Sequence, residues 1–312
     1  MVVFTNLEDM RFDGQLVLAI GTFDGVHRGH QYLLEQARAR AREHGLAFGI
    51  ITFDPAPALV LRPETTDYQI TPRELKIQLL SALQPDLLAV IPFTREFSML
   101  TAKQFVDILE RCLRLAELWM GDDFRFGHDR EGGIPYLLER ARHAEFAVHV
   151  VARQGAQAGA AGVSSTAVRE AIRAGDMEHA TELLGRYFEL SGIVVHGHAR
   201  GRALGYPTAN LQIPSQQIKP ASGVYAGIAE LPGEQFAAAI SVGTNPHFDG
   251  SETTVEAYLL DFDRDIYDQV LNLKFVRRLR EQARFETLAA LLDQIATDVE
   301  RTREAIQPLL AR

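Results

Sequence analysis

The first half of the chain alternates short apolar runs with segments whose apolar residues recur at helical spacing. Apolar runs of strand length cover residues 16–21, 48–53, 87–93, 118–121 and 147–152. Helices are predicted over residues 31–44, 71–83 and 101–115. Such alternation is typical of a parallel sheet covered on both faces. In these sheets, ligands bind beyond the carboxyl ends of the strands.

Helix-end signals support this interpretation. Gly45 ends the first predicted helix, and Thr71 with Glu74 forms a candidate capping box that has Pro72 at its first helical position. Thr101 with Gln104 is a second candidate capping box.

The pattern changes after a Gly/Ala/Gln-rich stretch at residues 154–162. Two short helices are predicted over residues 164–174 and 176–184, each followed by a glycine. Short strands then follow without a long helix between them, which favours an antiparallel sheet or small barrel; they cover residues 187–197, 223–231, 235–243, 254–262 and 269–276. A long closing helix starts near Thr287, with one apolar face made of Leu288, Leu291, Leu292, Ile295 and Val299.

A length of 312 residues suggests two domains, and the change of pattern places their boundary near Gly185. We therefore expect an α/β domain over residues 1–185 and an all-β domain over residues 186–312.

Composition narrows the class of protein. The single cysteine, Cys112, excludes an internal disulfide and a cysteine-based zinc site. No apolar run approaches about 18 residues and the N-terminus lacks a signal-peptide layout, so we expect a soluble cytoplasmic protein without a membrane partner. A net charge of −9 argues against nucleic-acid binding but not against a small anionic ligand. The oligomeric state stays open.

The first candidate site is GTFDGVHRGH at residues 21–30, between a predicted strand and a predicted helix. Free N–H groups and the positive end of a helix dipole bind phosphate at such a turn. His27 and His30 can face the same ligand, and Gly29 allows close approach to the backbone. Asp24 is either a turn residue or a ligand contact, and the alternative for the histidines is a helix cap with solvated rings.

The second candidate site is GHARGRALGYPTAN at residues 197–210. Its glycines and arginines suit a polyphosphate, and the oxygens of Thr208 and Asn210 suit Mg²⁺. A glycine-rich hairpin with exposed arginines is the alternative. The sequence contains no GxxxxGK[ST] or GxGxxG motif, so a kinase here is neither of the P-loop nor of the protein-kinase type. Glu256, in an otherwise apolar strand, is either a solvent-facing residue or the carboxylate that accepts a hydroxyl proton.

These motifs resemble the bifunctional riboflavin kinase/FAD synthetase family of bacteria. GTFDGVHRGH resembles the HxGH signature of nucleotidyltransferases with a Rossmann-like fold, and three further segments agree: TFDPAP (52–57), GDDFRFG (121–127) and VSSTAVR (163–169). The resemblance implies FMN adenylylation in this half, with His27 and His30 catalytic. The implied binding residues are Gly21, Phe23, Asp24, Gly29, Asp123, Phe124, Ser164, Ser165, Thr166 and Arg169.

The second half resembles riboflavin kinase through GRALGYPTAN, SVGTNP and LREQARF. The resemblance implies that Glu256 is the catalytic base and that Thr208 and Asn210 bind Mg²⁺. The implied binding residues are Gly201, Arg202, Gly205, Pro207, Thr208, Asn210 and Arg280. The expected substrates are riboflavin, FMN and ATP.

Three positions depart from the family pattern. Ala56 and Gln282 replace a histidine and a glutamate, His247 stands where threonine is usual, and Glu281 adjoins Gln282. Two alternatives therefore stay open: a monofunctional paralogue with one decayed site, and a non-catalytic flavin-nucleotide binder.

Overall fold

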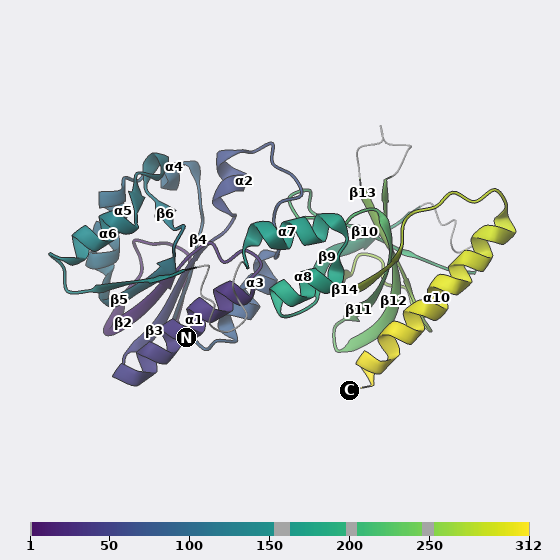
Figure 1. Cartoon of the computed structure of the whole chain (residues 1–312), viewed down its shortest axis with the longest axis horizontal. Helices are drawn as coiled ribbons and strands as arrows, with labels where there is room; N and C mark the ends of the chain where they lie inside the picture. The colour runs from purple at the N-terminus through teal and green to yellow at the C-terminus, as the bar shows by residue number, and fades with distance from the viewer. Residues whose placement is uncertain (1, 153–162, 198–204, 245–252, 312) are drawn as a thin grey trace. The chain divides into compact units, whose positions relative to one another are not determined.

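The structure, a computed structural model, describes residues 2–152, 163–197, 205–244 and 253–311 (Figure 1). Packing separates the chain into two units. The first comprises residues 1–65 and 69–165, and the second comprises residues 66–68 and 166–312. Gly201, Arg202 and His247 lie outside the described residues.

The first unit is built on a six-stranded sheet in the order β1-β4-β3-β2-β5-β8, in which every neighbouring pair is parallel. Its strands are β1 (Val2–Phe4), β2 (Phe12–Ile20), β3 (Ala47–Phe53), β4 (Leu87–Ile91), β5 (Leu113–Gly121) and β8 (Ala147–Val151). The predicted parallel sheet is confirmed, and β1 is a strand that the apolar pattern did not indicate.

Helices cover both faces of this sheet. The apolar side chains of α1 (Arg28–His44) and α3 (Arg73–Ser81) pack into one core cluster, and those of α5 (Ala102–Cys112) and α6 (Ile134–Ala141) pack into the other. The smaller elements are α2 (Pro57–Leu61), α4 (Arg95–Ser98), β6 (Arg125–Phe126), η1 (His128–Arg130) and β7 (Gly132–Gly133).

One of the two predicted capping boxes forms. At Thr101 both reciprocal hydrogen bonds with Gln104 are present. The prediction at Thr71 is wrong, because Pro72 is the N-cap of α3 and makes no side-chain cap bond. Thr71 is fully buried, and its N–H donates to the carboxylate of Asp24. The α5 helix also ends three residues before the predicted position, because Leu113 is extended and starts β5.

The second unit contains a closed six-stranded barrel in the order β10-β13-β12-β11-β14-β9, which confirms the predicted barrel. Its strands are β9 (Phe188–Val195), β10 (Ala209–Gln212), β11 (Gly223–Leu231), β12 (Glu234–Thr244), β13 (Thr253–Leu259) and β14 (Val270–Arg280). The short helices α7 (Ser165–Ala174) and α8 (Met177–Leu184) precede it, and α8 packs on β9 and β14.

The closing helix α10 (Leu288–Leu310) packs on the outer face of β11 and β12. Its predicted apolar face is only partly correct, because Leu288 is 57 % exposed. The three buried positions of α10 are Asp298, Thr302 and Ile306. The helix thus buries two polar side chains along the face that contacts the barrel.

Tyr225, inside the barrel, gives the fold a defined dependence on pH. Its hydroxyl donates to the carbonyl of Ala221 at 2.6 Å, and burial raises the pKa of this hydroxyl to about 12. In the unfolded chain the same hydroxyl loses its proton near its ordinary value of about 10. The stabilisation is therefore complete below pH 10 and is lost as pH rises from 10 to 12.

We predict that the unfolding free energy of the wild-type protein falls between about pH 9 and about pH 11, because the Tyr225 hydroxyl ionises more readily in the unfolded chain. In Tyr225→Phe, which lacks this hydroxyl, the fall over the same interval should be smaller by about 1 kcal/mol. Urea unfolding of both proteins at each pH measures the difference. Parallel pH dependence of the two proteins would contradict the role of the buried phenol.

Candidate active sites

The loop at residues 21–30 lies where the strand order of the first sheet reverses. From β2 the chain passes to β3 on one side, and after β4 it crosses to β5 on the other side of β2. In open α/β sheets such a reversal creates a crevice at the carboxyl ends of the strands. The loops that follow β2 and β5 therefore flank the place where this fold binds ligands.

The β2 loop has an unusual backbone. Phe23, Gly25 and Val26 have φ angles of 47°, 86° and 38°. Positive φ at the two non-glycine residues stores strain that the surroundings must hold in place, as occurs at ligand sites. At Gly21, a Cβ atom would lie only 3.0 Å from the ring of Phe23, so a larger residue there would have to displace that ring.

His27 and His30 are brought together at the start of α1. His27 is the N-cap, and its Nδ1 accepts the backbone N–H of His30 at 3.3 Å. Since Nδ1 is an acceptor, a neutral His27 ring carries its proton on Nε2, where it can be donated to an anion. The two rings stack with centroids 3.6 Å apart, and His30 also makes a T-shaped contact with Phe23.

Residues 163–165, which lead into α7 and include its first residue, contact this loop. The hydroxyl of Ser165 donates to the carbonyl of Asp24 at 2.9 Å. A Cβ atom at Gly29 would lie 3.2 Å from the His27 ring and 3.3 Å from the carbonyl oxygen of Val163. A side chain at position 29 would therefore press on the His27 ring and on the backbone at Val163. Ser164 is half-buried in the same segment.

Thr166 and Arg169 lie further along α7, in the second unit. Thr166 is exposed. Arg169 is buried, donates to the carbonyl of Tyr68 at 2.7 Å, and places its guanidinium 3.8 Å from the centre of the Tyr68 ring. Arg169 therefore contacts Tyr68, and its predicted contact with phosphate stays a prediction.

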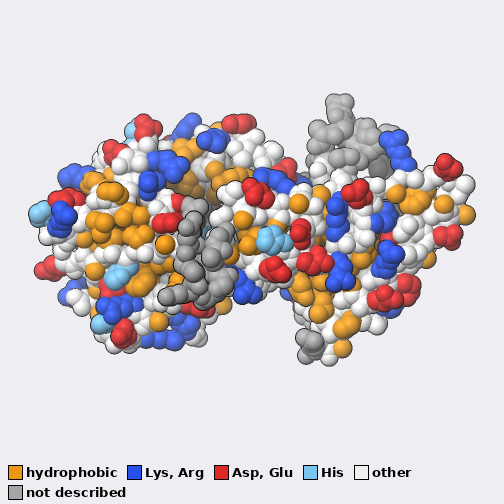
Figure 2. Space-filling view, viewed as in Figure 1, with side chains coloured by type: hydrophobic (Ala, Val, Ile, Leu, Met, Phe, Trp, Pro, Cys, Tyr) orange, Lys and Arg blue, Asp and Glu red, His pale blue; other side chains and the backbone are white. Residues whose placement is uncertain are grey.

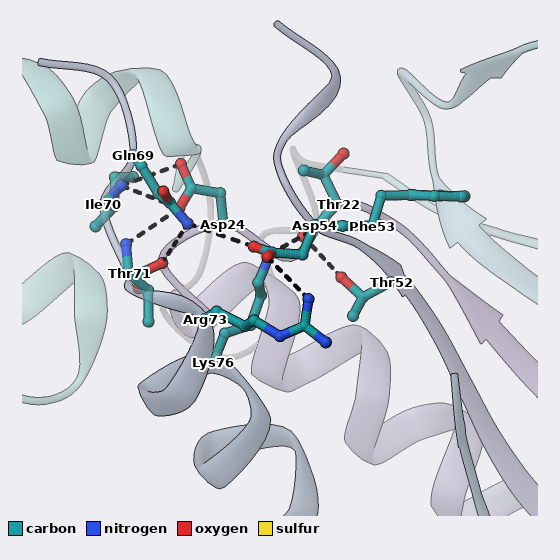
Figure 3. A network of polar contacts seen from close by, with 10 residues as sticks. All are labelled: Thr22, Asp24, Thr52, Phe53, Asp54, Gln69, Ile70, Thr71, Arg73 and Lys76. Atoms are coloured by element: carbon teal, nitrogen blue, oxygen red, sulfur yellow. Dashed lines mark hydrogen bonds and ion pairs between the residues drawn. The ribbon is translucent and has the colours of Figure 1, made fainter. Parts of the chain in front are cut away.

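Two buried carboxylates support the carboxyl edge of the sheet (Figure 3). The side chain of Asp24, 3 % exposed, accepts the N–H groups of Ile70 and Thr71. The ammonium group of Lys76, only 1 % exposed, lies 3.3 Å from Asp54 and donates to the carbonyl of Phe53 at 2.9 Å. Asp24 thus holds the chain that leads into α3, and Lys76 holds the end of β3.

Further contacts connect this network. Arg73 lies 3.4 Å from Asp54, and the Thr52 hydroxyl donates to the carbonyl of Thr22 at 2.9 Å (Figure 3). The end of β3 is thereby bound to the loop that carries the histidines. Lys76 was missed by the sequence reasoning, and its only signal was a cation among the apolar residues of α3.

The other flank of the crevice is the turn after β5. Asp123 is exposed there, and the N–H of Phe124 donates to the carbonyl of Gly121 at 3.1 Å. The Phe124 ring is half-buried and stacks on Phe126 at 5.5 Å. Both predicted binding residues thus follow the strand adjacent to β2.

The second candidate site is a row of side chains across the outer face of the barrel. Inside the barrel, Val255 and Ala257 are buried, so the intervening Glu256 faces outward. Glu256 is paired with Asn210 on one side and with Ser241 on the other. The row continues through Val224 to Arg280. Residues far apart in sequence therefore meet on one face.

Polar contacts order this row. The hydroxyl of Thr208 lies 3.1 Å from the carboxylate of Glu256 and donates to it. The amide of Asn210 occupies the space that a Cβ atom at Gly197 would need, so Gly197 makes room for it. Gly205 has a φ of 84° and Pro207 is exposed, and both precede β10.

At the far end of the row, Arg280 is held by α10. Its guanidinium donates to Asp298 at 2.7 to 3.1 Å through two nitrogens, and Asp298 also accepts from Gln294. Asp298 is 4 % exposed. This pair attaches the closing helix to the strand row, and a direct ligand contact of Arg280 stays a prediction.

Comparison with known proteins identifies a family for each half of the chain. Residues 9–167 match the FAD synthetase family and residues 184–306 match the riboflavin kinase family. The chain is 36 % identical to the bifunctional riboflavin kinase/FMN adenylyltransferase of Listeria monocytogenes, covering 92 % of this chain and 91 % of that protein. The Escherichia coli K12 protein of the same description is also 36 % identical, covering 92 % of each chain.

The chain belongs to the bifunctional riboflavin kinase/FMN adenylyltransferase family. A solved structure from Streptococcus pneumoniae, described as a macrolide-efflux protein, matches with a TM-score of 0.85 and 32 % identity over 97 % of this chain and 98 % of that one. Among the described residues of this family member, no helix combines the length and apolar character needed to cross a bilayer.

The buried ion pair of the first unit makes a testable contribution to stability. We predict that Lys76→Met lowers the unfolding free energy by about 3 kcal/mol, because Asp54 loses its buried partner and the Phe53 carbonyl loses a donor. Lys103→Met is the matched control: its side chain is 70 % exposed in an ion pair with Asp107, so we expect a loss below about 1 kcal/mol. Equal losses in urea unfolding would contradict this account.

Proposed function

We propose that the chain converts riboflavin to FAD in two steps on separate sites. The barrel transfers the γ-phosphoryl group of ATP to riboflavin, giving FMN and ADP. The α/β half transfers AMP from a second ATP to FMN, giving FAD and pyrophosphate. We assign these activities to residues 186–312 and 1–185, and we place the work in the cytoplasm, where ATP is available.

Adenylyl transfer needs no nucleophile from the protein, because a phosphate oxygen of FMN attacks the α-phosphorus of ATP. The protein must align two anions and stabilise the charge that develops between them. The protonated Nε2 of His27, the ring of His30 and the N–H groups at the start of α1 supply donors at this edge. The hydroxyls of Ser164 and Ser165 belong to the segment that packs on the loop.

Phosphorylation of riboflavin needs a group that takes the proton of the 5′-hydroxyl. Glu256 suits this role, because its carboxylate is half-buried on the outer face and is oriented by the Thr208 hydroxyl. This arrangement of Glu256 between Asn210 and Ser241 is the observation that carries the kinase assignment.

The oxygens of Thr208 and Asn210 fit Mg²⁺, which prefers oxygen ligands and retains several waters. Among the described residues, no cluster of three or more His, Cys, Asp or Glu side chains could hold a metal. When bound, Mg²⁺ would neutralise charge on the transferred phosphate. Figure 2 shows acidic and basic side chains interspersed over the visible face. Because the described residues of this face form no broad basic surface, we assign nucleotide binding to the two candidate sites.

Glu256→Gln tests the kinase site. We predict that FMN formation from riboflavin falls by about 10²–10⁴-fold because the base is lost, whereas FAD formation from added FMN is unchanged. Chromatographic product analysis measures both steps, with Glu234→Gln on the barrel surface as the control. FMN formation at the wild-type rate would remove Glu256 from the mechanism.

His30→Ala tests the adenylylation site. It keeps the backbone N–H that His27 accepts but deletes the ring beside it. We predict a loss of about 10²–10³-fold in FAD formation from FMN, with FMN formation from riboflavin retained. His44→Ala, at the exposed opposite end of α1, is the control. If FAD formation survives in His30→Ala, the histidine assignment is wrong. A chain that binds flavin without forming either product would be a non-catalytic binder.

A further inference from the structure

Gln282, just beyond β14, binds the end of β12 through its side-chain amide, although β11 lies between these two strands in the barrel. Its Nε2 donates to the hydroxyl oxygen of Ser241 at 2.9 Å and to the carbonyl oxygen of Val242 at 3.1 Å. A Cβ atom at Gly243 would lie 3.4 Å from the same nitrogen. The side chain therefore binds two consecutive residues of β12 and lies beside Gly243.

Ser241 connects this contact to the kinase site. It pairs directly with Glu256 across β12 and β13, and both side chains face outward. Residues opposite each other in an antiparallel pair have Cβ atoms about 4.5–5.5 Å apart. Gln282 therefore binds Ser241, the residue that lies directly opposite Glu256, the proposed base.

The chemistry of the two bonds requires an amide at position 282. Both partners of Nε2 are acceptors in these bonds, and an NH₂ group supplies the two hydrogens that they need. An ionised carboxylate has no hydrogen to donate, and its negative charge would face the partial negative charge of the Val242 carbonyl oxygen. Since the Ser241 oxygen accepts from Gln282, the hydrogen of the Ser241 hydroxyl is left to be donated elsewhere in the row.

We propose that Gln282 is a positioning residue of the riboflavin kinase site, which fixes Ser241 and the end of β12 beside Glu256 and must be an amide to do so. The proposal rests on the proposed function of Glu256. It also gives a reason for the glutamine that stands where the family pattern has glutamate: in this chain, the end of β12 is held by two donated hydrogen bonds.

The test compares Gln282→Met and Gln282→Glu in the full-length chain, with ATP and Mg²⁺ over a range of riboflavin concentrations. Gln282→Met removes both hydrogen bonds at similar size, so we expect kinase kcat to fall by about tenfold while the KM for riboflavin is unchanged. Gln282→Glu keeps the size of the side chain but has no hydrogen to donate to the Val242 carbonyl. We therefore expect a similar fall in kcat.

Two controls isolate the effect. Glu281→Gln changes the exposed neighbouring residue and should leave the kinase unchanged. FAD formation from added FMN should be unchanged in every variant. This activity shows that the variant chain is folded.

Wild-type kcat in both Gln282 variants would overturn the proposal, as would a faster kinase in Gln282→Glu. Loss of both activities would also overturn it, because Gln282 would then serve folding rather than the site. Retained kinase activity in Glu256→Gln would instead show that Glu256 is not the base. The two failures can be told apart, because in that case Gln282→Met would still lower kcat.

Discussion

The register of the hydrogen-bonded strands fixes where each chemical group stands in both halves of the protein. In the barrel, β13 is paired with β10 and β12 so that Glu256 meets Asn210 and Ser241 on the outer face. A slip of one residue would turn Glu256 into the apolar interior and Val255 outward, at a large cost in burial. The apolar alternation along β13 therefore stabilises the barrel and orients the proposed base at the same time. In the first unit, the parallel strands likewise end at one edge, where their loops converge.

The two halves prepare their polar groups in different ways. At the sheet edge, the buried carboxylates of Asp24 and Asp54 hold backbone N–H groups and Lys76, so their charge supports the loops. On the barrel, the row is exposed enough to meet a substrate and is fixed at its ends, by Thr208 on one side and by Arg280 with Asp298 on the other. The net charge of −9 does not reveal either arrangement, because it sums the charges of the whole chain and hides these local pairs.

Much of the fold follows from local pattern, because apolar runs and helix caps act over a few residues. The strands around β2 to β5, the Thr101 capping box and the position of His27 and His30 at a strand-to-helix turn were predictable in this way. β10 was not, because four residues with mixed polarity give no strand signal. The Thr71 cap failed because Asp24, 47 residues earlier in the chain, takes its N–H.

Roles that depend on a distant partner were the least predictable. Lys76 and Asp298 lie at buried helix positions, where apolar periodicity predicts no charged group. Their places depend on Asp54 and Arg280, and a linear pattern does not identify these pairs. The same holds for Gln282, whose departure from the family pattern was visible in the sequence while its contact with β12 was not.

The most direct test of two self-sufficient sites on one chain is a mixture of Glu256→Gln and His30→Ala incubated with riboflavin, ATP and Mg²⁺. Each variant keeps one proposed site and lacks the other. The account predicts that FAD forms in the mixture, because FMN released by one variant is adenylylated by the other, although neither variant alone makes FAD from riboflavin. Absence of FAD in the mixture would contradict it and would mean that the two steps require both intact sites on the same chain.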